Sequence, residues 1–195
     1  MTGTLTAANQ LTLLRMLLIP AFVILIVYGY PGWALLVFGF AGLTDGLDGL
    51  VARRAGQRTA LGAWLDPMAD KLLLVTTFVV LTVPGTDLVN RIPVWLTILV
   101  ISRDVVIVIT VAIVNLAVGR RAFRPSIYGK AATAIYIVTC VLFMYFNYLG
   151  RHSPIVDVAV YTSLAITLIS GLHYVAHAAR IINEPEIVSV KARKQ

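Results

Sequence analysis

Cysteine, histidine and acidic residues are scarce in this chain of 195 residues, which has one cysteine, three histidines and nine Asp plus Glu. The single cysteine, Cys140, lies in an apolar stretch, which excludes a disulfide framework and a thiolate metal site. Only 13% of the residues are charged and 59% are hydrophobic, with a mean hydropathy of +0.88. This composition is typical of a membrane protein.

The basic residues outnumber the acidic ones and give a formal charge of +7. They are not gathered into an arm or onto one helical face, so we expect no nucleic-acid partner. Residues 1–10 lack a basic segment, and no small-residue cleavage site follows the first apolar run. We therefore expect no cleavable signal peptide.

The sequence divides into six apolar runs separated by glycine, proline and charged residues. Each run is close to the roughly 20 residues that a helix needs to cross the hydrocarbon core of a bilayer. This pattern predicts an all-α polytopic membrane protein in which residues 1–195 form a single membrane-embedded catalytic domain. Residues 1–10 are expected to lie on the membrane surface and residues 184–195 to form a cytoplasmic tail. The predicted helices cover residues 11–29, 33–53, 62–83, 92–117, 129–149 and 156–180.

Charge predicts the orientation of these six helices. With an even number of crossings, both termini lie on one face of the membrane, and that face collects most of the basic residues. The loops on the opposite face hold only Arg91 and Arg151. The positive-inside rule places both termini in the cytoplasm of a bacterial-type inner or plasma membrane. The cytoplasmic basic residues are Arg53, Arg54, Arg58, Arg120, Arg121, Arg124, Lys130, Arg180, Lys191, Arg193 and Lys194.

Four of the nine acidic residues are concentrated between Asp45 and Asp70. A charged side chain at the centre of a membrane helix costs about 2.5–3.5 kcal/mol, so such residues are kept for a purpose. Asp45 and Asp48 are spaced i and i+3, and Asp66 and Asp70 are spaced i and i+4, which puts each pair on one helical face. Four carboxylates suit hard divalent cations such as Mg²⁺ or Mn²⁺. The absence of histidine and cysteine from the segment argues against zinc.

Small residues and an arginine accompany these aspartates. Gly49 and Ala52 allow a ligand or helix to approach the backbone closely, and Arg53 is suited to bidentate phosphate contact. Together they suggest a metal-bridged diphosphate at the membrane surface. Ordinary helix caps are one alternative for such acids. A divalent-cation channel or carrier is another, but it leaves Gly49, Ala52, Arg53 and Gly62 without a role.

The segment from Asp45 to Asp70 matches, position for position, the signature D-x2-D-G-x2-A-R-x8-G-x3-D-x3-D. In this segment the sequence resembles the CDP-alcohol phosphatidyltransferases. The resemblance implies a six-helix membrane fold, a homodimer and a reaction in which CDP-diacylglycerol and an alcohol give a phosphatidyl-alcohol and CMP. It also implies two Mg²⁺ or Mn²⁺ ions in each site.

The resemblance assigns a role to each position of the signature. Asp45, Asp48 and Asp66 resemble ligands of the first metal. Asp45, Asp66 and Asp70 resemble ligands of the second metal. Asp70 also resembles the general base that accepts the proton of the attacking hydroxyl. The residues that resemble contacts of the CDP-linked donor are Asn9, Thr12, Arg15, Gly49, Ala52, Arg53, Thr59 and Gly62.

The acceptor is expected to bind on the fourth to sixth helices. Arg103 and Asp104 form a charged pair well inside the fourth apolar run, where charge is costly and usually functional. The alternative interpretation is that Arg103 and Asp104 form a structural ion pair that holds helices together. Lys130, at the start of the fifth run, either meets an acceptor phosphate or only contributes to the positive-inside charge.

Several segments resemble the branches of the family that use glycerol-bearing acceptors, the phosphatidylglycerophosphate synthases and the CMP-forming cardiolipin synthases. The former usually have Arg-Glu where this chain has Arg103-Asp104, and a further arginine where Val105–Val114 is apolar. This departure favours phosphatidylglycerol as the acceptor, with glycerol 3-phosphate as the alternative. His173 and His177 are spaced like zinc ligands, but no third ligand is nearby, so packing at the membrane interface is favoured.

Overall fold

The computed structural model describes residues 7–55, 60–118 and 127–183, and every regular element in this part of the chain is an α-helix. The expected number and order of helices are confirmed. The helices are α1 (Ala7–Val27), α2 (Pro31–Ala55), α3 (Ala60–Thr82), α4 (Val94–Val118), α5 (Ile127–Tyr148) and α6 (Pro154–Asn183).

Glycine ends α1 and α5 in the same way. Gly29 and Gly150 adopt φ values of +78° and +63°, a left-handed conformation that glycine reaches without steric cost. The amide after each glycine bonds the carbonyl five residues back: Tyr30 N donates to Leu25 O at 2.8 Å and Arg151 N to Phe146 O at 3.2 Å. These are Schellman caps, and they reverse the chain within a few residues.

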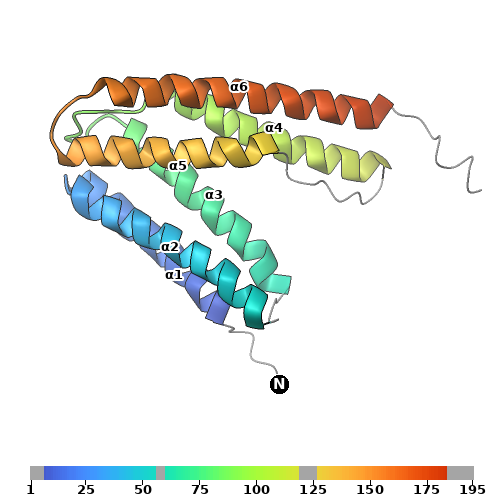
Figure 1. Ribbon diagram of the computed structural model, residues 1–195, viewed down its shortest axis with the longest axis horizontal. Coiled ribbons are helices and arrows are strands. Elements are labelled where there is room, and N and C mark those ends of the chain that lie inside the picture. The colour runs from blue at the N-terminus through green and yellow to red at the C-terminus, as the bar shows by residue number, and fades with distance from the viewer. Residues whose placement is uncertain (1–6, 56–59, 119–126, 184–195) are drawn as a thin grey trace, which may run out of the picture.

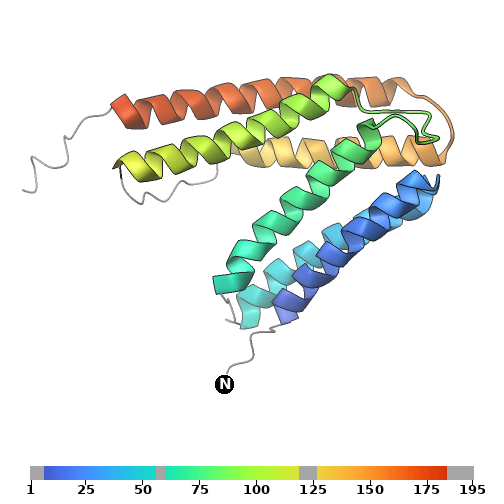
Figure 2. The same cartoon turned by 180° about the vertical axis from the view of Figure 1, so that it is seen from behind.

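The six helices form two groups of three. Within the first group α1 packs against α2 and α3, and within the second α6 packs against α4 and α5. The groups meet at the end that carries the α1–α2, α3–α4 and α5–α6 connections and diverge toward the other end (Figures 1 and 2). Contacts between the groups run from α3 to α4 and from α2 and α3 to α5.

Apolar side chains from both groups form one continuous core. Phe22 and Phe38 pack α1 on α2 with ring centroids 6.1 Å apart. Phe78 and Tyr136 join α3 to α5 in an edge-to-face contact at 5.6 Å. Because each of these rings is nearly or fully buried, the core fixes how the two groups meet.

The helix ends differ from the expected ones by a few residues. The α1 helix begins at Ala7, four residues before the expected start, so residues 7–10 are helical, and their expected place on the membrane surface stays a prediction. These residues are too polar to extend an apolar run, yet they contain no helix breaker. At the other end of the chain α6 continues to Asn183. Residues 1–6 and the whole expected tail, residues 184–195, lie outside the described residues.

Two of the six helices are long and apolar enough to cross a membrane by themselves. Within the described residues these are the segments Ile127–Tyr148 and Pro154–Ala176. Shorter apolar stretches occur at Thr12–Val27 in α1 and Pro31–Thr44 in α2. Length and composition therefore support crossings by α5 and α6 directly.

Candidate active site

A cavity of about 240 Å³ lies between the two groups of helices. Five helices, α1 to α5, contribute to its wall. The apolar part of the lining includes Phe38, Leu73 and Ile137, and the charged part consists of Arg15, Asp70, Lys71, Arg103 and Asp104. Five charged side chains around one small cavity indicate a site for a charged ligand.

Arg15 on α1 and Asp70 on α3 form an ion pair through Arg15 Nη1 and Asp70 Oδ1. The Arg15 side chain is 1% exposed, whereas that of Asp70 is 46% exposed. Thr12, one turn before Arg15 on the same face of α1, is also fully buried. The geometry thus presents a carboxylate to the cavity from one side and a buried cation behind it.

A second charged group links α3, α4 and α6. Lys71 Nζ donates to Asp104 Oδ2 at 3.1 Å, and Arg103 Nη1 donates to Asp104 Oδ1 at 2.7 Å. Arg103 Nη2 also donates to Ser170 Oγ on α6. The Arg103 side chain is only 9% exposed. Asp104 therefore bridges the two groups of helices beside Asp70.

Tyr136 and Thr133 of α5 complete the polar part of the wall. The Thr167 hydroxyl donates to Ser163 O at 2.6 Å, so the buried Tyr136 hydroxyl, 2.6 Å from Thr167 Oγ1, is the donor of that bond. The Tyr136 ring is held in place by α6 and faces the cavity from α5.

The other aspartates of the signature lie on the helices that carry the site. The α2 helix includes Asp45 and Asp48, and α3 includes Asp66 and Asp70. Helical backbone at these positions puts each pair on one helical face, as expected from the spacing. The side chains of Asp45, Asp48 and Asp66 lie outside the described residues.

The expected donor contacts are distributed over the same helices. Asn9, Thr12 and Arg15 follow one another at one-turn intervals along α1, and of these only Thr12 and Arg15 have described side chains. Thr59 lies outside the described residues. The remaining positions fall on the described backbone of α2 and α3, with side chains outside the description: Gly49, Ala52 and Arg53 on α2, and Gly62 on α3.

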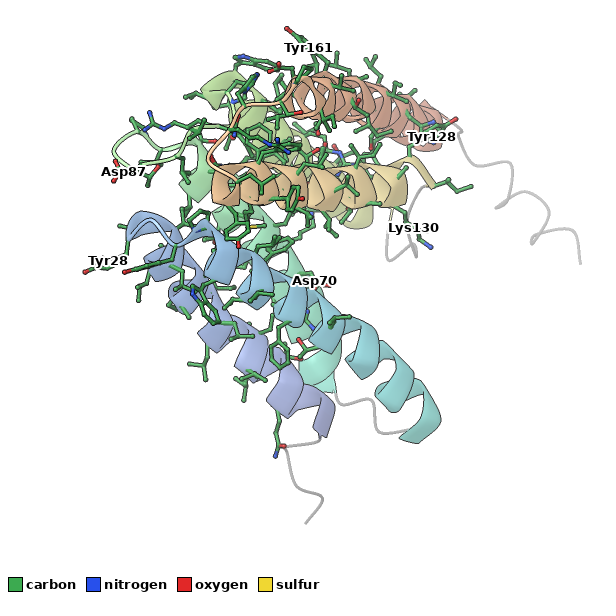
Figure 3. All side chains as sticks on the ribbon, turned by 60° about the vertical axis from the view of Figure 1, so that its left-hand side comes forward. Tyr28, Asp70, Asp87, Tyr128, Lys130 and Tyr161 are labelled. Atoms are coloured by element: carbon green, nitrogen blue, oxygen red, sulfur yellow. The ribbon has the colours of Figure 1, made fainter. Side chains whose placement is uncertain are left out.

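The structure brings two of the three expected acceptor residues to the cavity. Arg103 and Asp104 line it, whereas Lys130 is exposed and does not. Figure 3 shows the Lys130 side chain at the start of α5, directed outward. Thr133, one turn further along α5, lines the cavity instead. His173 packs against Tyr128 with ring centroids 4.6 Å apart, and the His177 side chain lies outside the description.

Three residues around the cavity carried no signal in the sequence. Lys71 was one basic residue among many, Tyr136 one aromatic residue in an apolar helix, and Ser170 one hydroxyl on α6. Their positions depend on how distant helices pack.

These features define a helical protein with one cavity lined by both basic and acidic side chains. Residues 5–175 match the family model of the CDP-alcohol phosphatidyltransferases, and the chain belongs to that family. It is therefore a transferase of phospholipid biosynthesis and not a cation channel or carrier. Family membership and the two membrane-length helices together indicate a membrane protein.

The chain is similar to proteins of two kinds. A probable phosphatidylglycerophosphate synthase of Mycobacterium tuberculosis (strain ATCC 25618 / H37Rv) is 35% identical over 187 residues, covering 90% of this chain and 82% of the relative. A CMP-forming cardiolipin synthase of Streptomyces coelicolor is 38% identical over 138 residues, covering 66% and 60%. The CMP-forming cardiolipin synthase of Homo sapiens is 37% identical over 149 residues, covering 68% and 48%.

Proposed function

We propose that this protein transfers the phosphatidyl group of CDP-diacylglycerol to the glycerol hydroxyl of phosphatidylglycerol, forming cardiolipin and releasing CMP. The observation that carries the proposal is that one cavity is lined by an acidic and a basic side chain from different groups of helices. Asp70, at the end of the aspartate signature, and the buried Arg103 line the same 240 Å³ space from opposite groups of helices. A donor held at Asp70 would then meet an acceptor held at Arg103.

Asp45, Asp48, Asp66 and Asp70 would hold two Mg²⁺ or Mn²⁺ ions. The fit rests on the chemistry of the donors, since carboxylate oxygens at helical spacing on α2 and α3 suit hard cations. The half-exposed Asp70 carboxylate also remains accessible from the cavity despite its pairing with Arg15. When bound, such ions stabilise negative charge on the diphosphate and on the departing CMP.

The residues of this chain supply the remaining chemistry. The hydroxyl oxygen of the acceptor attacks the phosphorus that carries the diacylglycerol, a new P–O bond forms, and the bond to the CMP oxygen breaks. Asp70 accepts the hydroxyl proton, and CMP leaves with the electron pair. Arg15 orients the Asp70 carboxylate through their ion pair and adds positive charge next to the diphosphate. The donor contacts would be Asn9, Thr12, Arg15, Gly49, Ala52, Arg53, Thr59 and Gly62.

Arg103 would bind the phosphate of the acceptor. Its side chain is 9% exposed and lines the cavity, and its guanidinium donates hydrogen bonds to Asp104 and Ser170. Lys130 would attract anionic lipid from the exposed start of α5 without contacting the reacting groups.

Two observations separate the possible acceptors. The apolar segment Val105–Val114 after Asp104 supplies no second arginine for a phosphate monoester, which favours the singly charged phosphodiester of phosphatidylglycerol. Glycerol 3-phosphate is the second candidate, because the relative that matches 90% of this chain is a probable phosphatidylglycerophosphate synthase. Both acceptors present a glycerol hydroxyl and a phosphate.

The proposed membrane orientation follows from the distribution of basic residues, and the proposed oligomeric state follows from the family resemblance. All six helices cross the membrane. Both termini and the cavity lined by Asp70 and Arg103 lie on the cytoplasmic side, in accordance with the positive-inside rule. The protein would work as a homodimer, as the family resemblance implies. A water-soluble cytidine and the lipid tails of both substrates then reach one interfacial site.

The decisive experiment supplies the purified protein with CDP-diacylglycerol, Mg²⁺ and one acceptor at a time, and identifies the lipid product by mass spectrometry. The acceptors are phosphatidylglycerol, glycerol 3-phosphate, inositol phosphate and serine. Cardiolipin as the main product supports the proposal, and phosphatidylglycerophosphate would establish the second candidate. A preference for inositol phosphate or serine would refute both.

A further inference from the structure

We propose that Ser170 on α6 is a positioning residue for the acceptor: it holds Arg103 so that one edge of the guanidinium stays available to the acceptor phosphate. The inference rests on the proposed function, since it concerns the acceptor side of the same cavity. It assigns a role to a residue that does not itself line the cavity.

The contact between Ser170 and Arg103 joins two helices inside the second group. Ser170 is 1% exposed, and its Oγ accepts a hydrogen bond from Arg103 Nη2. The aliphatic part of Arg103 passes next to Gly171, where an added Cβ would lie 3.9 Å from Arg103 Cγ. The Arg103 side chain therefore passes α6 at Gly171 and is held at its tip by Ser170.

The N–H groups of Arg103 that are not bonded to Asp104 or Ser170 remain available to a ligand. A guanidinium has five N–H groups in a fixed planar fork. One on Nη1 goes to Asp104 and one on Nη2 goes to Ser170. Arg103 Nε is buried and has no hydrogen-bond partner within the described residues. A buried donor without a partner costs about 1–3 kcal/mol, so its retention indicates a ligand that satisfies it.

Phosphate is the ligand chemistry that fits this edge. Two adjacent N–H groups of a guanidinium bind two phosphate oxygens at once, and such charge-assisted pairs are stronger than neutral ones. Arg103 lines the cavity that also contains Asp70. With the tip fixed by Ser170 and Asp104, Arg103 Nε is the buried donor that remains for an oxyanion bound beside it.

A second buried serine on α6 provides the matched control. Ser163 is fully buried like Ser170, but its hydroxyl lies 2.8 Å from Thr139 Oγ1 on α5, away from Arg103. Neither Ser163 nor Thr139 lines the cavity. Ser163→Ala thus removes a buried interhelical hydroxyl of α6 without touching the acceptor side.

The test compares Ser170→Ala, Ser170→Thr and Ser163→Ala in steady-state assays of CMP release, with phosphatidylglycerol and with glycerol 3-phosphate as acceptors. Loss of the hydrogen bond to the charged Arg103 should raise the KM for the productive acceptor about tenfold in Ser170→Ala. The KM for CDP-diacylglycerol should not change. Ser170→Thr, which retains the hydroxyl, should restore the acceptor KM at least in part, and Ser163→Ala should resemble the wild type.

A double variant tests whether Ser170 acts through Arg103. In the Arg103→Lys background the guanidinium edge is absent, so adding Ser170→Ala should change the acceptor KM by less than twofold. A full tenfold effect in that background would overturn the inference. The inference would also fall if Ser170→Ala kept a normal acceptor KM, or if Ser163→Ala raised it equally.

Binding without turnover separates failure of this inference from failure of the proposed function. Stabilisation of the donor-free protein by glycerol 3-phosphate, measured as a shift in Tm, should be weaker in Ser170→Ala than in Ser163→Ala. If wild-type protein releases no CMP with either acceptor, the proposed function fails, while this shift still tests the anion site. If Ser170→Ala does not fold, the isosteric Ser170→Cys, a weak acceptor, should reproduce the rise in acceptor KM.

Discussion

Arg15 is fully buried in α1, and its partner, Asp70, is half exposed at the cavity. Removal of one member of a buried ion pair is destabilising, so this contact contributes to the packing of α1 on α3. The same contact fixes one oxygen of Asp70 and leaves the carboxylate accessible from the cavity. One ion pair thus contributes to both stability and the orientation of the proposed base.

Replacing Arg15 by lysine separates charge from geometry. The ammonium retains the positive charge but cannot make the planar, two-pronged contacts of a guanidinium. We expect Arg15→Lys to lower kcat/KM for CDP-diacylglycerol by about 10- to 100-fold, because loss of charged hydrogen bonds costs about 1.5–3 kcal/mol. Steady-state kinetics measure this effect. The control is Arg91→Lys in the α3–α4 connection, and an equal loss there would argue against a specific role of Arg15.

Polar side chains join the α3–α4 and α5–α6 connections. Asn147 near the end of α5 bonds both backbone groups of Asn90: its Oδ1 accepts from Asn90 N at 2.8 Å and its Nδ2 donates to Asn90 O at 2.9 Å. Asn90 Nδ2 in turn donates to Arg151 O, and its Oδ1 lies 2.6 Å from His152 Nδ1. This network ties the two groups of helices together at the end where they meet.

Asn147→Ala should destabilise this junction. It leaves the buried amide and carbonyl of Asn90 without their partner, which we expect to lower the free energy of unfolding by about 3 kcal/mol. Chemical unfolding in detergent micelles measures the change. Asp87→Ala, at an exposed position of the same connection, is the control and should change stability by less than about 0.5 kcal/mol. Equal stability of Asn147→Ala and the wild type would show that the network is unimportant.

The sequence predicted the helices better than it predicted their contacts. Each helix contains a long apolar run between turn residues, so number and order were accessible from hydropathy. The pairing of Arg15 with Asp70 was not, because nothing in a single sequence links positions 15 and 70. Ser170 gave no signal for the same reason: a lone hydroxyl in an apolar helix looks like any other. Arg103 and Asp104 were found because charge is rare in such a helix.

The molecule as a whole is asymmetric along its length. The two groups of helices converge at one end, which carries Arg91 and Arg151, and diverge toward the end where α2 contains Arg53 and Arg54 (Figures 1 and 2). The cavity with Asp70 and Arg103 lies between the groups. In the proposed function, the donor and the acceptor reach this cavity from opposite groups of helices.

Cysteine labelling tests the proposed orientation. The only cysteine, Cys140, is buried, so single cysteines can be introduced without strong background labelling. In intact cells a membrane-impermeant maleimide should label Asp87→Cys in the α3–α4 connection. Ile127→Cys, at the 83% exposed start of α5, should react only after permeabilisation. The reverse pattern would invert the orientation and place the site on the outer face.

The central claim is that phosphatidyl transfer takes place in the cavity lined by Asp70 and Arg103, and the rate of Mg²⁺-dependent CMP release from CDP-diacylglycerol by Asp70→Asn tests it most directly. Proton transfer alone typically contributes about 10²–10⁴-fold, and the amide removes a metal ligand as well as the proposed base, so we predict a fall in kcat of at least about 10³-fold. Asp87→Asn should keep the wild-type rate, and chelation of the metal should abolish it. Full activity of a folded Asp70→Asn protein would contradict the account.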